Sequence, residues 1–381
     1  MKKLVIAVLA IGAMAACTKS NIQYEQPEEI SFQPVAKKAT KAVNGAIDGT
    51  EYPTGENFNV WSWWTSKEAG TSIGSIGDFD MANTNPDKPI LYINAGTFTN
   101  RKDADSKPTN TWGGETPYYW PTTGSLVFAG YSPSDASSSD NTFNYDFNSK
   151  NFTVTNYIQS NKIDETVDLM WFDADESYKK NGAVSVTFRH ALSWLEFKFK
   201  LADGVTQKNW KIKKVTLNGI ETKADFSSSS MKWINHPTEG ANFNNQMTIF
   251  TGNKILTSSI ADYLSDESTA ESTAARKNEK SGVVVIPQSC APAQGGNRAD
   301  AELVIDYDLL TPASTGSASE VYIPQKVTLP LTYIAEGGST PEYEWEPGYH
   351  YIYTITFGAN EILIFPSVTD WTDETENIDV V

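Results

Sequence analysis

The sequence predicts an all-β protein built as two β-sandwich domains in tandem. Its apolar segments are dominated by Tyr, Phe, Trp, Thr, Val and Ile, residue types that are enriched in strands. Glycine (25) and proline (18) interrupt these segments at short intervals, and helical periodicity is hard to find. Many short strands with turn signals between them indicate a sandwich or barrel, and 381 residues are enough for two domains.

The first residues have the pattern of an export signal. Two lysines precede a short apolar run over residues 4–11, which is too short to span a bilayer. Small residues then precede Cys17, and this arrangement resembles the lipobox of bacterial lipoproteins. The resemblance implies a signal peptide over residues 1–17 with Cys17 as the lipidated N-terminus of the mature chain; an ordinary cleaved signal is the alternative. The polar residues 18–28 are expected to form a flexible stalk.

Residues 30–35 form the strand around which we expect the chain to be organised. Ile30, Phe32 and Val35 supply its apolar side chains, and the first of them alternate with polar residues, as in a strand. Pro34 has no N–H group to donate, so it predicts an edge or terminal strand.

A lysine-bearing tether follows this strand. Lys37, Lys38 and Lys41 lie in a turn-like segment, and residues 57–64 then read as the next strand. A short strand is thus joined to the body of the protein by a segment that a protease could cut. A strand that is cut away leaves an open place in a sheet, which a strand from another molecule can take.

The rest of the chain reads as strands separated by polar turns. Further strands are expected, in order, at residues 90–93, 125–131, 142–147, 152–157, 168–172, 183–190, 192–201, 210–217, 224–227, 246–250, 283–286, 301–307, 327–334, 350–357 and 361–365. Residues 100–116 are expected to be a loop, and residues 268–278 either an exposed loop or one short helix.

Two further features concern the organisation of these strands. The apolar alternation changes phase between Phe188 and Leu195, which requires a β-bulge or a corner near Ser193. A polar stretch over residues 175–182 then suggests a boundary, with an N-terminal domain over residues 29–180 and a C-terminal domain over residues 181–381.

Charge and cysteine content exclude several classes of function. The formal net charge is −17, with 47 acidic residues against 30 basic ones. A nucleic-acid backbone would repel such a chain, so no nucleic-acid partner is expected, nor a basic membrane-surface module. Cys290 is the only cysteine after Cys17, so no internal disulfide is expected, and Cys290 reads as a small, partly buried residue.

No catalytic residue, metal site or cofactor is predicted. The three histidines, His190, His236 and His350, have no metal-ligand spacing, and His190 reads as a structural histidine. Acidic pairs such as Asp173 and Asp175 read as solvated loop acids. No nucleophile elbow, phosphate-binding glycine loop or dinucleotide motif occurs. A secreted hydrolase is therefore the weakest of the hypotheses, and we expect no enzyme.

Clustered aromatic residues leave a second hypothesis open, that of a surface glycan-binding lipoprotein that never polymerises. Exposed aromatic rings could stack on sugars, whereas buried ones would pack the cores, and the alternation in residues 349–357 favours packing. The clusters are Trp61, Trp63 and Trp64; Tyr118, Tyr119 and Trp120; and Tyr349, Tyr351 and Tyr353.

Several segments together resemble the fimbrillin-like lipoproteins of Bacteroidales, the subunits of type V pili. Spread over most of the chain, they are the lipobox ending in Cys17, residues 40–42, 52–61, 119–121, 126–133, 186–193, 285–288, 345–351, 368–371 and 378–381. The resemblance implies two transthyretin-like sandwich domains, with export to the outer membrane and cell surface as a lipid-anchored protein.

The same resemblance implies how the chain assembles. A trypsin-like maturation protease would cut after Lys37, Lys38 or Lys41 and remove the strand carrying Ile30, Phe32 and Val35. Other pilus subunits would then join by strand exchange, with Ile378, Val380 and Val381 as inserting side chains of a donor tail. The best-known members are cut at arginine, whereas the first arginine here is Arg101. Either the protease accepts lysine, or the strand is not removed.

Overall fold

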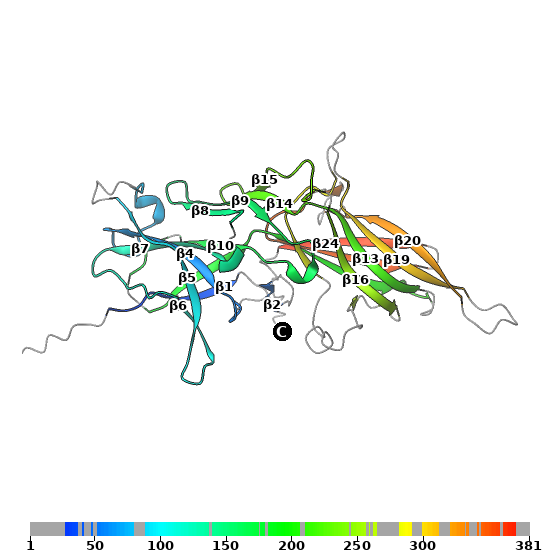
Figure 1. The fold of residues 1–381 in the computed structure, drawn as a ribbon, viewed down its shortest axis with the longest axis horizontal. Helices are drawn as coiled ribbons and strands as arrows, with labels where there is room; N and C mark the ends of the chain where they lie inside the picture. Colours follow the sequence, from blue (N-terminus) through cyan, green and yellow to red (C-terminus); the bar gives the residue numbers. More distant parts are fainter. Residues whose placement is uncertain are drawn as a thin grey trace, which may run out of the picture.

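A computed structural model describes residues 27–36, 40–41, 47–48, 52–79, 88–136, 139–174, 176–179, 182–205, 210–243, 245–256, 259, 262–264, 282–291, 299–311, 321–331, 333–334, 341–342, 344–358 and 361–370. Strands make up almost all of the regular structure in these residues, which confirms the all-β class (Figure 1). The helical elements described are three short 3₁₀ turns, η1 (Ile73–Ser75), η2 (Ser134–Ala136) and η3 (Ile163–Glu165). The possible helix at residues 268–278 lies outside the described residues.

The N-terminal half contains a sheet that closes on itself. Its strands, in spatial order, are β1 (Ser31–Ala36), β11 (Val184–His190), β10 (Met170–Asp173), β7 (Ser125–Ser132), β4 (Phe58–Thr65), β5 (Ile90–Lys102) and β6 (Pro108–Gly114). A core of aromatic and aliphatic side chains fills its interior. Every residue of β7 is buried, because β7 packs against this interior on one face and against a second core on the other.

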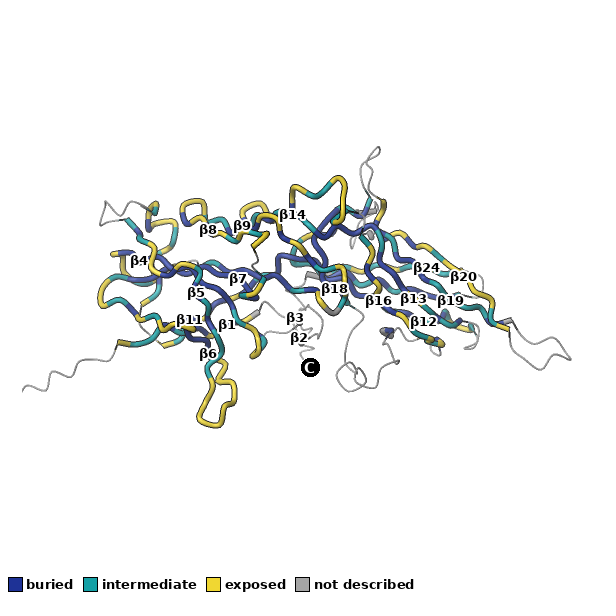
Figure 2. The backbone as a smooth tube through the Cα atoms, viewed as in Figure 1, coloured by how far each residue is buried: buried dark blue, intermediate teal, exposed yellow. Residues whose placement is uncertain are grey.

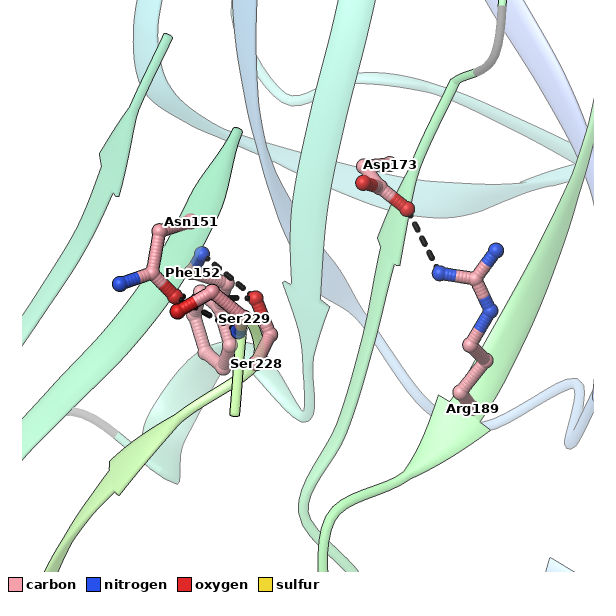
Figure 3. Close-up of polar contacts among 6 residues, drawn as sticks. All are labelled: Asn151, Phe152, Asp173, Arg189, Ser228 and Ser229. Carbon is pink, nitrogen blue, oxygen red and sulfur yellow. Dashed lines mark hydrogen bonds and ion pairs between the residues drawn. The ribbon is translucent and has the colours of Figure 1, made fainter. Parts of the chain in front are cut away.

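A smaller sheet covers the outside of the closed sheet. It consists of β15 (Lys232–Ile234), β14 (Lys223–Ser227), β9 (Asn151–Ile158) and β8 (Thr142–Asp146). Between the two sheets lies the second core, which includes Trp61, Trp63 and Phe152. Figure 3 shows the Asn151 carboxamide oxygen accepting hydrogen bonds from the Ser228 hydroxyl (3.2 Å) and the Ser229 N–H (3.0 Å), which ties β9 to the turn after β14.

The C-terminal half is a sandwich of two sheets packed face to face. One contains β17 (Asp262–Tyr263), β12 (Ser193–Leu201), β23 (Tyr349–Phe357) and β24 (Ile362–Asp370), with β18 (Gly282–Val285) also paired to β12. The other contains β16 (Asn245–Ile255), β13 (Trp210–Ile220), β19 (Glu302–Thr311) and β20 (Val321–Pro330). Buried side chains from both sheets, such as Phe197 and Ile212, form a single core, and Cys290 lies in it. The short pairs β2 (Thr40–Lys41) with β3 (Ile47–Asp48) and β21 (Tyr333–Ile334) with β22 (Pro341–Glu342) complete the strands.

The predicted break near Ser193 is a corner between two sheets. β11 ends at His190 in the closed sheet, and β12 begins at Ser193 in the C-terminal sandwich. The phase slip in the sequence therefore marks the place where the chain passes from one core to another. The Trp233 indole N–H on β15 donates to the Ala191 carbonyl at this corner (2.6 Å).

Strand pairings cross the predicted domain boundary. The division at residue 181 and the transthyretin-like character of the domains stay predictions. The closed sheet nevertheless contains β11, and the covering sheet contains β14 and β15, all from beyond residue 181. Figure 1 shows β14 and β15 lying beside β8 and β9, next to the closed sheet.

One predicted loop is wrong. Residues 100–116 contain the end of β5 and the whole of β6, which pair as a hairpin. Only three of the seven residues of β6 are buried, one of them Trp112 and the others glycine, so the strand lacks an alternating apolar pattern. Figure 2 shows the tip of this hairpin as an exposed loop that stands away from the buried strands. In the part of the chain that the structure describes, no helix has the length and apolar character needed to cross a bilayer.

Candidate functional site at strand β1

Strand β1 places one face of its side chains in the core of the closed sheet. Ile30 and Phe32 are 0% exposed, and Pro34 is buried on the same face. Val35 is 40% exposed, so the prediction that it is an inserted side chain is wrong. Side chains alternate between faces with a period of two, which places 30, 32 and 34 together and turns Val35 to the solvent.

The prediction of an edge strand is also wrong for the first part of β1. Ser31 and Phe32 pair with Gly113 and Trp112 of β6 in the antiparallel sense. On its other side β1 runs parallel to β11, with pairs from Phe32–Val184 to Ala36–Phe188. Pro34 pairs with β11 but lies past the residues of β1 that pair with β6. Its missing N–H is tolerated there, because that side of the strand has no ladder partner among the described residues. β1 is thus the strand that closes the sheet between β6 and β11.

Phe32 is surrounded by the rings of other phenylalanines. Its centroid lies 4.9 Å from that of Phe98, 5.1 Å from that of Phe128 and 5.8 Å from that of Phe58, all edge to face. Phe172 follows at 6.4 Å in a tilted arrangement. Edge-to-face contacts are a favoured geometry for aromatic pairs. We call these four rings the Phe32 site.

Backbone hydrogen bonds hold the residues that precede β1. The Ile30 N–H donates to the Tyr118 carbonyl (2.7 Å), and the Trp120 N–H donates to the Glu28 carbonyl (3.0 Å). The Gly182 N–H donates to the Glu28 carboxylate (3.2 Å). The hydrogen bonds therefore begin at residue 28, before β1 itself, and all of them must break when the strand leaves the sheet.

Arg101 forms an ion pair with Glu29 at the same end of β1. The guanidinium also donates to the Gly114 carbonyl (3.2 Å). It lies where a β-carbon at position 113 would stand, so Gly113 leaves the room for Arg101 to reach Glu29. Both side chains are more than a third exposed, so the pair adds little stability.

Tyr52 packs beneath this region and connects it to β11. Its ring stacks on Phe188 (5.1 Å) and meets Trp112 edge to face (5.3 Å). The phenol oxygen lies 2.6 Å from the Ser132 hydroxyl oxygen. Burial raises the pKa of the Tyr52 phenol well above its ordinary value, so the group stays neutral in the folded protein.

β11 keeps its other partner independently of β1. Arg189 on β11 donates to the Asp173 carboxylate on β10 (2.7 Å), as Figure 3 shows, and its guanidinium lies 4.8 Å from the centre of the Trp171 ring. Asp173 is thus an ion-pair partner within the sheet and not a solvated loop acid. Removal of β1 would open the sheet between β6 and β11 and leave the other strand pairs in place.

The structure tests few of the other predicted site residues. Lys41 lies in β2, where its backbone pairs with Ile47. Lys37 and Lys38, the lipidation residue Cys17 and the tail residues Ile378, Val380 and Val381 lie outside the described residues. Their roles in processing, anchoring and donation stay predictions.

Most of this chain matches the sequence model of one known protein family. The sequence model described as fimbrillin-like matches residues 40–371. The chain belongs to the fimbrillin-like family. No curated protein gives a significant match. Family membership supports a pilus subunit or an adhesion role at the cell surface, in a fimbrium, and association with other pilus subunits, rather than an enzymatic role.

One solved structure shares the fold of this fimbrillin-like chain, and two others align over most of its length. A fimbrial protein from Bacteroides vulgatus is 16% identical with a TM-score of 0.52, over 91% of this chain and 100% of that one. A proposed cell adhesion protein from Bacteroides uniformis is 14% identical with a TM-score of 0.46, over 91% of this chain and 100% of that one. Another from Bacteroides ovatus is 13% identical with a TM-score of 0.45, over 92% and 99%.

The histidines of the fimbrillin-like chain each face a carboxylate. His190 lies 3.0 Å from Asp168, and both side chains are buried, an arrangement that favours the predicted structural role. His350 lies 3.2 Å from Glu196, and His236 pairs with Glu221. Among the described residues, no group of three or more His, Cys, Asp or Glu side chains is placed to hold a metal ion.

Most of the clustered aromatic residues pack the cores, as predicted. Those buried are Trp61, Trp63, Trp120, Tyr351 and Tyr353, while Trp64, Tyr118 and Tyr349 are half-buried. Tyr119 is 44% exposed, so one ring from these clusters faces the solvent. The aromatic content therefore reflects cores built from rings, and the glycan-binding hypothesis gains no extended exposed surface from these clusters.

Sequence reasoning missed the residues that face β1. Arg101 and Gly113 are far from β1 in the chain and lie within residues 100–116, which the sequence predicts to be a loop, while Tyr118 stands out only as part of an aromatic cluster. The two consecutive glycines after Trp112 were the available signal, because a glycine inside a strand marks a close approach of another group. Here that group is the Arg101 guanidinium.

Proposed function

We propose that this chain is a structural subunit of a type V pilus, in a stalk, tip or anchor position, assembled by protease-triggered donor-strand exchange. Family membership supports the coarser part, a pilus subunit or adhesion protein. The observation that carries the finer part is the position of β1. That strand closes a sheet, fills its core with Ile30 and Phe32, and precedes a tether with Lys37, Lys38 and Lys41.

The energetics favour exchange over simple loss of the strand. Burial of Ile30 and of Phe32 each contributes on the order of 1.5–3 kcal/mol. Departure of β1 would forfeit both contributions and leave β6 and β11 as open strand edges, which readily accept another strand. A severed β1 therefore stays in place until an incoming strand takes over its pairings and its apolar contacts.

A single cut would change both attachment and assembly. Cys17, the proposed lipidation site, lies on the same side of Lys37, Lys38 and Lys41 as β1. Cleavage after any of these lysines separates the lipid and β1 together from the body of the protein. A processed subunit is then held at the outer membrane only through its neighbours in the pilus, whereas an uncut subunit remains anchored by its own lipid.

The donor segment that this chain offers to a neighbour is its tail. Ile378, Val380 and Val381 supply its apolar side chains, with Asp379 between the first two. The spacing of Ile378 and Val380 is the same as that of Ile30 and Phe32, which suits insertion of alternate side chains into the β1 position of another subunit.

Limited proteolysis tests the proposal. A trypsin-like protease acting on the mature chain is expected to cut after Lys37, Lys38 or Lys41. When other pilus subunits are added, native mass spectrometry should then detect complexes in which the cut chain has lost residues 30–35. A matched variant with all three lysines changed to alanine should remain uncut and monomeric. If the cut chain keeps its β1 peptide bound and stays monomeric with other pilus subunits added, strand exchange is wrong.

A further inference from the structure

The Phe32 site is built for an aromatic side chain. Phe32 is 0% exposed, and the four surrounding phenylalanine rings stand at centroid distances of 4.9 to 6.4 Å. These rings come from β4 (Phe58), β5 (Phe98), β7 (Phe128) and β10 (Phe172), which pair with one another in the closed sheet. Since all four lie on paired strands, they cannot move inward freely to fill a vacated volume.

The tail of this chain matches the β1 position except at this site. If Ile378 takes the place of Ile30, then Asp379 takes that of Ser31, Val380 that of Phe32 and Val381 that of Gln33. Ile378 repeats the aliphatic residue. Asp379 would take the position of Ser31, which pairs with Gly113. The Arg101 guanidinium lies beside Gly113, so the carboxylate of Asp379 would face a positive charge there.

Val380 is the mismatch. It has no ring to meet the four phenylalanines, and its insertion would leave the volume of most of a phenyl group unfilled. The mismatch does not depend on the direction of the inserted strand, because Ile378, Val380 and Val381 are all aliphatic. Residues 29 to 32 of this chain show which sequence fits the position. They are an acidic residue, an aliphatic residue, a residue of any kind and an aromatic residue, in that order.

We infer that the β1 position of this subunit selects a strand with an aromatic side chain at the place of Phe32, and that its partner there is a different subunit and not a second copy of this chain. The inference rests on the proposed strand exchange and assigns its partner. A copy of the chain would donate a tail that leaves the Phe32 site part-empty. The chain therefore joins other subunits at this site and does not form a homopolymer through it.

Two substitutions in the uncut chain test the selectivity of the site. Phe32→Val and Gln33→Val give β1 the residues that the tail carries at the aligned positions, Val380 and Val381. Position 32 is buried and position 33 is exposed, so the second variant is the control. We expect Phe32→Val to lower the melting temperature by several degrees and Gln33→Val to leave it nearly unchanged. Equal melting temperatures for the two variants would overturn the inference.

Peptide capture tests the partner. The chain is cut in its tether and mixed with three labelled peptides: residues 28–35, the same peptide with Phe32→Val, and residues 372–381. We expect the first to bind about 10- to 100-fold more tightly than the other two. A tail peptide that binds as tightly as the first would overturn the inference and favour a homopolymer. If none of the peptides binds, strand exchange is contradicted, and so is the assigned partner. The two melting temperatures would still show whether the site prefers an aromatic side chain.

Discussion

The ring of Phe32 meets the ring of Phe98 edge to face, with their centroids 4.9 Å apart. One residue belongs to the first strand of the chain and the other to β5, on the far side of β6 in the closed sheet. The contact passes through the interior, so β1 belongs to the core and is not a ribbon laid over it. A strand with this position can be exchanged only for another strand that restores the core.

Truncation of Phe32 should measure how much β1 contributes to stability. Phe32→Ala removes a ring that is 0% exposed from among four others, so we expect the free energy of unfolding to fall by about 3–5 kcal/mol in urea titrations. The matched control is Val35→Ala on the same strand, where the side chain is 40% exposed and a change within about 0.5 kcal/mol is expected. Similar losses for the two variants would show that β1 is not part of the core.

Two glycines should respond differently to alanine. A β-carbon at Gly130 on β7 would collide with the Asn59 backbone carbonyl and the Phe172 ring, neither of which can move freely, so we expect Gly130→Ala to cost about 1–3 kcal/mol. The atoms nearest to a β-carbon at Gly113 would be those of the Arg101 guanidinium, which can swing into solvent, so we expect Gly113→Ala to cost at most about 1 kcal/mol.

Chemical denaturation compares the two glycine variants directly. A crystal structure of Gly113→Ala should show Arg101 displaced from Glu29 while β1 keeps its pairing with β11. A stability loss for Gly113→Ala as large as that for Gly130→Ala would mean that the Arg101 side chain is fixed in place and that its contact with Glu29 matters more than its exposure suggests.

Alkaline pH should destabilise the protein through buried phenols. Burial raises the pKa of Tyr52 and of Tyr157 well above the ordinary value of about 10. Above about pH 10 the unfolded chain releases these protons and the folded chain keeps them, so each group's contribution is complete below that pH and falls by about 1.4 kcal/mol per pH unit above it. Urea unfolding from pH 8 to 11 should show this decline. Tyr157→Phe should make the decline shallower, and an unchanged slope would contradict the assignment.

The N-terminal folding unit should require residues from beyond the predicted domain boundary. A fragment of residues 27–180 lacks β11, which pairs with both β1 and β10, and β14, which pairs with β9. We expect this fragment to show no cooperative thermal transition, whereas the full chain shows one. A fragment that melts cooperatively by circular dichroism would instead support a division at residue 181.

The sequence predicted strands well where a core imposes a pattern. Residues 57–64 were predicted as the strand that the structure shows as β4, because Phe58 and Val60 meet one core while Trp61 and Trp63 meet the other. The corner before Ser193 was predictable because a period of two cannot change phase within one sheet. β6 was missed because Trp112 is its only large buried side chain, so it carries no periodic signal.

The candidate site was predictable only in part. The alternation of Ile30 and Phe32 identified β1, but treating Val35 as the third inserted residue overlooked Pro34 as an apolar side chain on the inner face. Nothing local to β1 indicates that its neighbours are β6 and β11, whose residues come from distant parts of the chain. Which strands pair depends on the topology of the whole chain, and the sequence pattern of one strand does not show which partners it will have.

The intact mass of the protein in assembled fibres is the decisive measurement for strand exchange. We expect a chain that begins at Lys38, Ala39 or Ala42, without β1 and without the acyl groups of Cys17. Fibres whose subunits still contain residues 30–35, joined to an acylated Cys17, would overturn the proposed exchange.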